Sequence, residues 1–427
     1  MAFPAAIERD IQQLVQDSVD EFVQHRNTGL PRAAVLATTS ATETLVRAVA
    51  GFEQVDDDAG NKDSWPKITD ESLFPLWSST KLVTAIAALQ LVEQGKIRLD
   101  DDASKYVREL KDLEILTGYS TDGEPEYKPN SHRCTIENLI THTAGFKYDA
   151  QYAEIQRKLG LASIYDENST RESLTKSPFL LPPGTEFSYG TANDWLALLV
   201  AEVSGMPFDK YLEDNIFNPL GITDMTFTNP SNRVSVAVSP EFGLNPDAPP
   251  APDAPKPDGP YTFDQGRQFT QSISWGGAGL TGSPKSYLKI LRMLLRNGEA
   301  ESGNRRVLEE ATVQSMFEPR LRGKPLETFV PAVSQGNDPW SHAKKEQFEG
   351  VNYGLGGTLC GAGIPSGRSK GALTWSGYAN SFWVVDREQD VAFIVWSCLL
   401  PHSHPAIMKM WSKVEPKIYE GIQSSKE

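Results

Sequence analysis

The chain has 427 residues, of which 39% are hydrophobic and 23% are charged, a composition typical of a globular protein. Acidic residues outnumber basic ones by 56 to 41, giving a formal net charge of −15 at pH 7. A surface of this sign repels phosphate backbones and anionic lipid headgroups, so we expect neither a nucleic acid nor a membrane as a partner. The length exceeds what one hydrophobic core usually serves, which predicts two packed domains or one domain with a large insertion.

The cysteines and the N-terminal residues indicate the compartment. The three cysteines, Cys134, Cys360 and Cys398, are few and show no C-x-x-C spacing, which argues against a disulfide framework and a zinc ribbon. The first ten residues lack a basic segment followed by an apolar one, and no run of 18 apolar residues occurs. We therefore expect a cytoplasmic protein without a transmembrane helix.

The first hundred residues predict one helix, two strands and a second helix, in that order. Apolar residues recur with helical period over residues 5–28, which predicts an amphipathic helix. Two short strand-like runs follow, at 33–37 and 44–50. A long helix then opens at about Ser78 and runs to Gln94. It is apolar nearly all round, so we expect it to be buried on every side.

The middle of the chain, from 99 to 228, has a helical pattern with loops and includes a second apolar helix at 195–204. Residues 240–260 then carry eight prolines, a density that neither a helix nor a sheet tolerates, so we expect an extended loop there. A loop of this length is often a lid or a binding loop, and a spacer is the equally compatible alternative.

The C-terminal part returns to strands. The pattern predicts them at 372–375, 381–385 and 391–397, and a closing helix at 406–422. Strands near both ends with helices between them indicate a sheet domain assembled from both termini and interrupted by a helical domain.

Ser78 and Lys81 form a Ser-x-x-Lys pair at the head of the apolar helix. Residues three apart share a helix face, so Lys81 can lie beside the Ser78 hydroxyl. A serine hydroxyl becomes a good nucleophile only when a base takes its proton. Burial favours the neutral form of lysine, so we expect Lys81 to be able to act as that base. The helix N-terminus would also direct backbone N–H groups toward a developing oxyanion.

The same spacing occurs elsewhere in the chain, so the spacing alone is weak evidence. Only the Ser78 pair follows an apolar strand-like run and opens a long buried helix. The alternative interpretation of this pair is a solvated capping serine with an exposed lysine. The other pairs begin at Ser64, Ser173, Ser286 and Ser341.

Two further segments carry residues that can face a cleft. Tyr189 lies between a Pro-Gly turn and the second apolar helix, at the edge of a loop, although an isolated tyrosine there usually packs and makes one hydrogen bond. Trp375, Ser376 and Gly377 end a predicted strand, where glycine permits close approach of a ligand to the backbone. An ordinary turn between two strands is the alternative for this second segment.

These three features, in this order, resemble the motifs of the serine β-lactamase, penicillin-binding and esterase superfamily. The resemblance covers nearly the whole chain and thins in the Pro-rich loop and at 320–350. Within the superfamily, residues 189–195 and 215–227 are most similar to the lovastatin acyltransferase (transesterase) group. Other segments that resemble the superfamily are 139–145, 218–222 and 275–281.

The resemblance implies a β-lactamase-like α/β (α+β) fold, with an antiparallel sheet covered by helices. Residues 1–100 and 270–427 would form the sheet domain, residues 101–235 an inserted, mainly helical domain, and residues 236–269 a Pro-rich loop or lid. The active site would lie at the junction of the two domains.

The resemblance also implies roles for individual residues. Ser78 would be the nucleophile that becomes acylated, and Lys81 and Tyr189 would handle its proton. The backbone N–H groups of Ser78 and Tyr378 would form the oxyanion hole. Trp375, Ser376 and Gly377 would bind substrate, and His142 would be structural. No cofactor and no metal are implied.

Two departures from the superfamily motifs bear on the substrate. The usual Tyr-x-Asn is Tyr189-Gly-Thr191 here, so the asparagine amide is missing. The usual Lys-Thr-Gly is Trp375-Ser-Gly377, which lacks the cation that holds a β-lactam carboxylate and favours a neutral, apolar group. The segment Pro401-His-Ser-His404 near Cys398 has no metal-ligand spacing, and we expect it to have a surface or loop role.

The function predicted from these residues is acyl transfer from an ester or thioester to an alcohol of a small, polyketide-like metabolite. The partners would be a small-molecule acyl donor and an alcohol acceptor, and an acyl-carrier protein is a further candidate donor. The alternative is a carboxylesterase that hydrolyses small-molecule esters. A β-lactamase, a D-amino-acid peptidase and a non-catalytic binding protein are less favoured.

Overall fold

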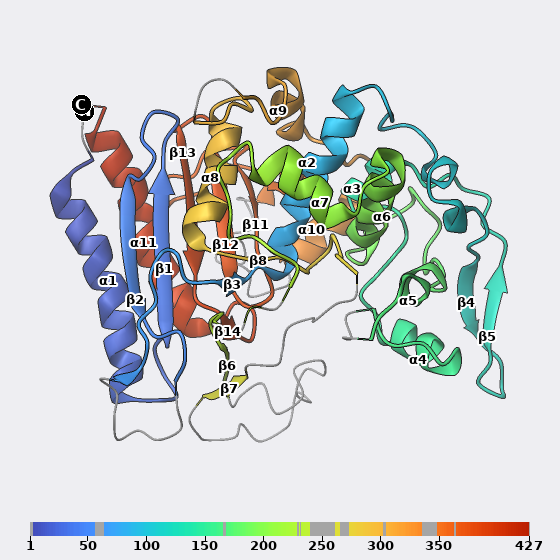
Figure 1. The fold of residues 1–427 in the computed structure, drawn as a ribbon, viewed down its shortest axis with the longest axis horizontal. Coiled ribbons are helices and arrows are strands. Elements are labelled where there is room, and N and C mark those ends of the chain that lie inside the picture. The colour runs from blue at the N-terminus through green and yellow to red at the C-terminus, as the bar shows by residue number, and fades with distance from the viewer. Residues whose placement is uncertain are drawn as a thin grey trace.

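A seven-stranded antiparallel sheet forms the centre of the larger part of the molecule (Figure 1). The computed structural model describes residues 3–55, 64–164, 168–228, 230, 232–239, 261–264, 273–301, 305–334, 348–362 and 364–426. The Pro-rich segment 240–260 lies outside the described residues, so its role as a lid stays a prediction, as do the predicted domain boundaries. In sheet order the strands are β2 (Val46–Gly51), β1 (Arg32–Thr38), β13 (Val391–Trp396), β12 (Ser381–Asp386), β11 (Leu373–Trp375), β10 (Thr358–Leu359) and β9 (Asn352–Tyr353).

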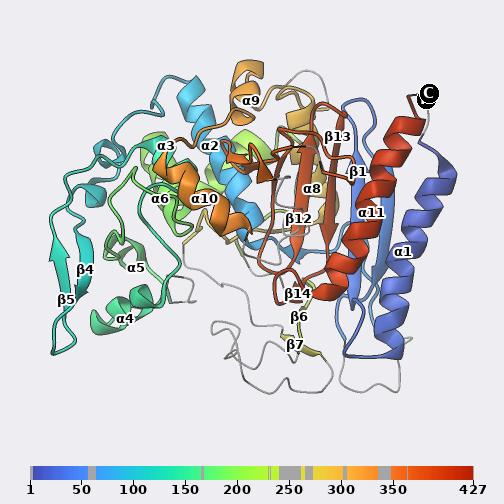
Figure 2. The ribbon, with the colours of Figure 1, turned by 180° about the vertical axis from the view of Figure 1, so that it is seen from behind.

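The sheet joins the two ends of the chain, as the sequence predicts, because N-terminal β1 pairs with C-terminal β13. Helices α1 (Ala5–Gln24) and α11 (Pro405–Ser424) lie side by side against one face, and α8 (Pro284–Leu295) covers the other (Figures 1 and 2). Successive strand residues point to opposite faces, and here both faces are covered. The central strands β12 and β13 are therefore buried along their whole length.

Helix α2 (Thr80–Glu93) joins this sheet to the helical part of the molecule. Every residue from Thr80 to Leu91 is buried, which confirms the burial expected from its apolar sequence. Helix α6 (Ala192–Ser204), the second predicted apolar helix, packs against α2 and begins three residues earlier than predicted. Gly205 ends α6 with a left-handed backbone, φ 70°.

The segment between the two parts of the sheet is mainly helical, but it contains a hairpin that the sequence analysis did not predict. Strands β4 (Ile115–Tyr119) and β5 (Pro125–Lys128) form this hairpin at the edge of the molecule (Figure 1). Asp122-Gly123 supplies the turn, with Gly123 at φ 77°. The helices of this segment are α3 (Ile136–Ile140), α4 (Ala150–Lys158), α5 (Arg171–Thr175) and α7 (Phe208–Leu212).

Further short strands form smaller sheets, separate from the seven-stranded one. Strand β3 (Phe74–Pro75) pairs with β8 (Thr281–Gly282). Strand β6 (Val236–Val238) lies between β7 (Thr262–Asp264) and β14 (Leu399–Leu400). Two further helices are α9 (Glu310–Met316) and α10 (Lys324–Ser334).

Candidate active site

Ser78 lies in a 3₁₀ turn, Trp77–Ser79, that leads directly into α2. Its side chain is half-buried, while Ser79 and Thr80 on either side of the helix start are fully buried. Trp77 has a positive φ of 49°, which is costly for a bulky residue and is found mostly at functional sites. The turn therefore presents Ser78 on a strained but firmly packed backbone.

The turn Trp77–Ser79, called the nucleophile turn below, is held against the sheet by hydrogen bonds of hydroxyl groups. Ser79 Oγ donates to the Ser381 carbonyl at 2.9 Å, and Ser381 Oγ donates to the Leu76 carbonyl at 3.1 Å. From the other side, Tyr287 Oη donates to the Ser79 carbonyl at 2.9 Å. These buried bonds fix the Ser78 backbone relative to β12 and α8.

Lys81 lies beside Ser78, as the three-residue spacing predicts. Its side chain is buried, with 1% of the residue exposed. Lys81 Nζ donates to Ser78 Oγ at 3.1 Å, to Tyr148 Oη at 3.2 Å and to the Gly277 carbonyl at 2.6 Å. An ammonium has three N–H donors and no acceptor, so these three acceptors suit the charged form of the lysine.

The charge state of Lys81 differs from the sequence expectation. Burial lowers the pKa of Lys81, but its electrostatic interactions with Tyr148, Tyr189 and Asp194 outweigh burial and raise that pKa above the ordinary value. Asp194 is itself fully buried, and its Oδ1 accepts the Gly277 N–H at 2.7 Å. The prediction that burial would favour neutral Lys81 is therefore wrong, because Tyr148 and Tyr189, together with the buried Asp194 on α6, outweigh the effect of burial.

Tyr189, which precedes helix α6, contacts Lys81 from the helical part of the molecule. Lys81 Nζ lies 4.8 Å from the centroid of the Tyr189 ring. Trp375 Nε1 donates to Tyr189 Oη at 3.4 Å, so the tyrosine also contacts the end of β11. The structure thus brings together Ser78, Lys81, Tyr189 and Trp375 from three segments far apart in the sequence.

Tyr148 is a member of the cluster that the sequence analysis missed. Its hydroxyl accepts from Lys81, its ring lies 5.3 Å from the Tyr189 ring, and its backbone N–H donates to the Tyr189 carbonyl at 3.0 Å. The residue is 38% exposed, so it stands at the opening of the cluster. No pattern in the sequence distinguishes it from the other tyrosines.

His142 lies beneath Tyr189, where a structural role was predicted. The ring is fully buried, 4.6 Å from the Tyr189 ring, and its Nε2 is 3.4 Å from Asn193 Nδ2. Burial, together with the positive charge of Lys81, holds the pKa of His142 well below its ordinary value. A neutral histidine that supports Tyr189 fits this position.

The Trp375–Tyr378 turn packs directly on the nucleophile turn. A side chain at Gly377 would collide with the Leu76 carbonyl and with Ser381 Oγ, so only glycine fits there. The rings of Trp77 and Tyr378 meet edge to face, with centroids 5.3 Å apart, and Trp77 directly precedes Ser78. Ser376 differs from its neighbours, because its hydroxyl lies 2.9 Å from His402 Nε2.

Aromatic side chains continue outward from Trp375. Tyr353 meets the Trp375 ring at 5.6 Å, and behind it Phe187 and Phe329 form a small separate core that includes part of α10. The wall of the cluster on this side is thus apolar and rigid.

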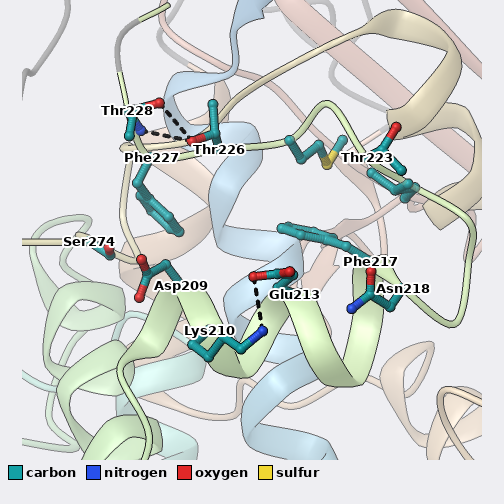
Figure 3. Close-up of a pocket in the computed structure, with 12 residues that line it drawn as sticks. Asp209, Lys210, Glu213, Phe217, Asn218, Thr223, Thr226, Phe227, Thr228 and Ser274 are labelled. Carbon is teal, nitrogen blue, oxygen red and sulfur yellow. Dashed lines mark hydrogen bonds and ion pairs between the residues drawn. The ribbon is translucent and has the colours of Figure 1, made fainter.

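A separate cavity lies between α7 and the loop at 222–228, with a volume of about 440 Å³ (Figure 3). Lys210 Nζ forms an ion pair with Glu213 at 3.2 Å at its edge. None of its lining residues belongs to the Ser78 cluster. Those residues are Asp209, Lys210, Glu213, Phe217, Asn218, Ile222, Thr223, Met225, Thr226, Phe227, Thr228 and Ser274.

Two further observations apply to the part of the chain that the structure describes. Within it, no three His, Cys, Asp or Glu side chains are grouped so that they could hold a metal ion. Within the same residues, no helix is both long enough and apolar enough to cross a membrane.

This fold, with serine, lysine and tyrosine meeting at the head of a buried helix, is that of a β-lactamase-like enzyme of acyl transfer. The model of the Beta-lactamase family matches residues 11–406. The chain therefore belongs to the Beta-lactamase family.

Similar proteins of known name indicate which reaction this family member belongs with. A lovastatin esterase from Penicillium rubens is 30% identical over 86% of this chain and 88% of its own. A monacolin J acid methylbutanoyltransferase from Aspergillus terreus is 26% identical over 98% of both chains. The solved structure of the LovD6 mutant of simvastatin synthase from Aspergillus terreus superposes with a TM-score of 0.81, at 26% identity, over 97% of this chain and 98% of that one. The chain is thus an acyl-transfer enzyme of a group that contains both transferases and an esterase.

Proposed function

We propose that this enzyme moves an acyl group from an ester or thioester to an alcohol of a small, polyketide-like metabolite, through an acyl-Ser78 intermediate. The observation that carries the proposal is the position of Ser78: its hydroxyl is half-buried yet lies 3.1 Å from the ammonium of a fully buried Lys81. The transferase relatives support the choice of an alcohol as acceptor.

In the proposed first step, Ser78 Oγ attacks the acyl carbonyl carbon and its proton passes to Tyr189 Oη. In this proposal Lys81 and Tyr189 act as one pair that shares the proton taken from Ser78. A lone tyrosinate at pH 7 costs about 4 kcal/mol, and the adjacent cation offsets part of that cost. The position of Lys81 Nζ, 4.8 Å from the ring centroid, supports this role.

The charge that develops on the carbonyl oxygen would be held by the backbone N–H groups of Ser78 and Tyr378. The contact between the Trp77 and Tyr378 rings supports this assignment, because it keeps the two backbone segments adjacent. The leaving alcohol or thiol takes the proton from Tyr189, which leaves the acyl group on Ser78. The acceptor alcohol then attacks the acyl carbonyl carbon and gives its proton to Tyr189, the bond from that carbon to Ser78 Oγ breaks, and Ser78 Oγ takes the proton back from Tyr189.

The substrate that suits this site is neutral and apolar near the acyl group. Trp375 stands where a cation would hold a carboxylate, and aromatic rings extend from it toward α10. Trp375 and Gly377 would border the acyl group, while Ser376 would act through the turn. This wall disfavours β-lactams and D-amino-acid peptides. An acyl-carrier protein as donor and a cytoplasmic location stay predictions.

The proposal is tested by intact-mass spectrometry with a short-chain acyl thioester of N-acetylcysteamine as donor. Wild-type protein should gain the mass of one acyl group, and Ser78→Ala should gain none while it keeps its thermal stability to within about 1 kcal/mol. A Ser78→Ala protein that still turns over the donor at a substantial rate would overturn the mechanism.

A panel of alcohols distinguishes transferase from esterase, the second candidate that the lovastatin esterase relative favours. A transferase binds its acceptor against the acyl-serine, where effective molarities can reach about 10⁵ M or more. A bulky polycyclic alcohol should therefore accelerate loss of the acyl group and should itself be recovered as the ester. Deacylation at one rate, whatever alcohol is offered, would make the enzyme a carboxylesterase.

A further inference from the structure

The turn that ends β11 is held from the side opposite the candidate site. Trp375 pairs with Trp383, and the Gly377 N–H donates to the Ser381 carbonyl at 3.1 Å, so Ser376 lies opposite Phe382. Neighbouring strand residues point to opposite faces. Since Trp375 contacts Tyr189 on the site face, Ser376 points toward the face that α1 and α11 cover, where Phe382 is buried.

On that face Ser376 meets His402. Ser376 Oγ lies 2.9 Å from His402 Nε2, and the other ring nitrogen, Nδ1, lies 3.1 Å from Ser403 Oγ. The His402 ring also packs against the Phe382 ring at 5.4 Å. A neutral imidazole has one donor and one acceptor, and a hydroxyl can serve either, so the ring matches both of its partners. Burial lowers the pKa of His402 to about 4, which keeps the ring neutral at pH 7.

The segment that carries His402 is itself fixed to the turn after β11. Asn380 Nδ2 donates to the Pro401 carbonyl at 3.0 Å, and Asn380 Oδ1 accepts the Ser403 N–H at 2.6 Å. The Asn380 backbone N–H donates to the Gly377 carbonyl at 2.9 Å. These bonds hold the turn that carries His402 in place, and the expected surface or loop role gave no sign of the contact between His402 and Ser376.

The position of this turn matters because it packs on the nucleophile turn without free space. Gly377 contacts the Leu76 carbonyl, and Tyr378 contacts Trp77, the residue before Ser78. A shift of the Trp375–Tyr378 turn would move the Tyr378 backbone and the Trp375 wall together relative to Ser78. A misplacement of about 1 Å in such a site can cost on the order of 10²-fold in rate.

We propose that His402 is a positioning residue for acyl transfer, because its hydrogen bond to Ser376 fixes the Trp375–Tyr378 turn relative to Ser78. This inference rests on the proposed function and names the residue that holds one side of the same site. His402 does not touch the substrate in this proposal, so its effect must pass through Ser376.

Three substitutions at residue 402 separate the hydrogen bond from the packing. His402→Gln places an amide near the position of Nε2 and can keep the bond to Ser376. His402→Asn reaches only the position of Nδ1, and His402→Phe keeps the ring but removes both bonds. With a p-nitrophenyl ester of a short acid, we expect kcat to fall about 10- to 100-fold in the Asn and Phe variants, with KM little changed. His402→Gln should recover most of the wild-type kcat.

Ser376→Ala completes a double-mutant cycle. If His402 acts through Ser376, this variant should lose about as much kcat as His402→Phe, and the double variant should lose little more. His404→Gln is the matched control, because His404 Nδ1 accepts the Ala406 N–H at 3.2 Å and caps α11. This control should lower the melting temperature and leave kcat unchanged.

The proposal is overturned if folded His402→Phe keeps kcat within about twofold of wild type. It is also overturned if the losses at residues 402 and 376 multiply, or if they appear in KM alone, since a direct substrate contact would then explain them. If His402→Phe does not fold, the comparison of the Asn and Gln variants decides the same question. Mass labelling of wild type and Ser78→Ala reports separately on the proposed function, whatever the 402 variants do.

Discussion

Lys81 Nζ donates to the Gly277 carbonyl at 2.6 Å, the shortest of its three hydrogen bonds to Ser78, Tyr148 and Gly277. The N–H of the same glycine donates to Asp194 at 2.7 Å. Gly277 therefore stands between a buried cation and a buried carboxylate and is bonded to both. A single backbone residue of the 275–279 loop thus couples α2 to α6 at the site.

Asp194→Asn tests this arrangement. The amide oxygen can still accept the Gly277 N–H, but the negative charge that helps to keep Lys81 protonated is lost. We expect kcat to fall about tenfold or more, with a loss of folding stability on the order of 1–3 kcal/mol, measured by ester turnover and chemical denaturation. An Asp194→Asn enzyme with wild-type activity would show that the charge of Asp194 has no part in the reaction.

The two tyrosines of the cluster should differ in their contributions. Tyr189→Phe and Lys81→Ala should each lower kcat on the order of 10² to 10⁴-fold, the usual range for positioned acid–base groups. Their double variant should fall little further if the two residues act as one unit. Tyr148→Phe removes only one acceptor of Lys81, so its loss should be smaller, about tenfold. The four variants are compared with wild type by initial rates on one ester. Equal losses of kcat in Tyr189→Phe and Tyr148→Phe would contradict these roles.

Acid pH should destabilise the protein through two histidines, His142 and His402. The pKa of His402 is lowered to about 4, and that of His142 lies well below its ordinary value, so the unfolded chain binds more protons below pH 6.5. The contribution of these two histidines to the free energy of unfolding is therefore fully present above about pH 6.5 and is lost as the pH falls toward 4. In urea titrations at pH values between about 6.5 and 4, the free energy of unfolding of His402→Gln should fall less steeply with decreasing pH than that of wild type. The difference in slope should be at most about 1.4 kcal/mol per pH unit. Parallel curves for the two proteins would be the contrary result.

Gly377→Ala should damage the site more than the fold. Its Cβ would collide with the Leu76 carbonyl and Ser381 Oγ, so the Trp375–Tyr378 turn must move away from Ser78. We expect kcat to fall on the order of 10²-fold, with a loss of stability of about 1–3 kcal/mol. Gly371→Ala is the control for backbone strain, because Gly371 has φ 82° and open space around it. That variant should lose stability and keep its kcat.

Local patterns were enough to predict much of the fold and the core of the site. Apolar runs predicted β12, β13 and α2, because strands and helices buried on every side carry few polar residues. The Ser78–Lys81 contact follows from helix geometry alone. The family resemblance added Tyr189, which no local rule could bring to Lys81.

The parts that were missed depend on long-range contacts without a sequence signal. Tyr148 contacts Lys81 from a loop 67 residues away in the sequence. Gly277 binds Lys81 through its backbone carbonyl, and a glycine has no side chain from which this contact could be predicted. The raised pKa of Lys81 depends on Tyr148, Tyr189 and Asp194, and only the packing of α6 on α2 brings Asp194 near. His402 lies in a turn, which agrees with the surface or loop role expected for it, but no sequence pattern pointed to the contact of its ring with Ser376.

The pairing of β1 with β13, and of the Ser78 turn with Ser381, also has a consequence for biosynthesis. The ribosome makes Ser78 early, but the strand residues that hold its turn are more than 300 residues away, with the Ser79–Ser381 bond spanning 302. The nascent chain must therefore carry helix α2, apolar on nearly every side, without its sheet until β12 and β13 have emerged. Reactivity at Ser78 can arise only after that point, so a ribosome-bound chain halted before residue 381 should not react with acyl donors.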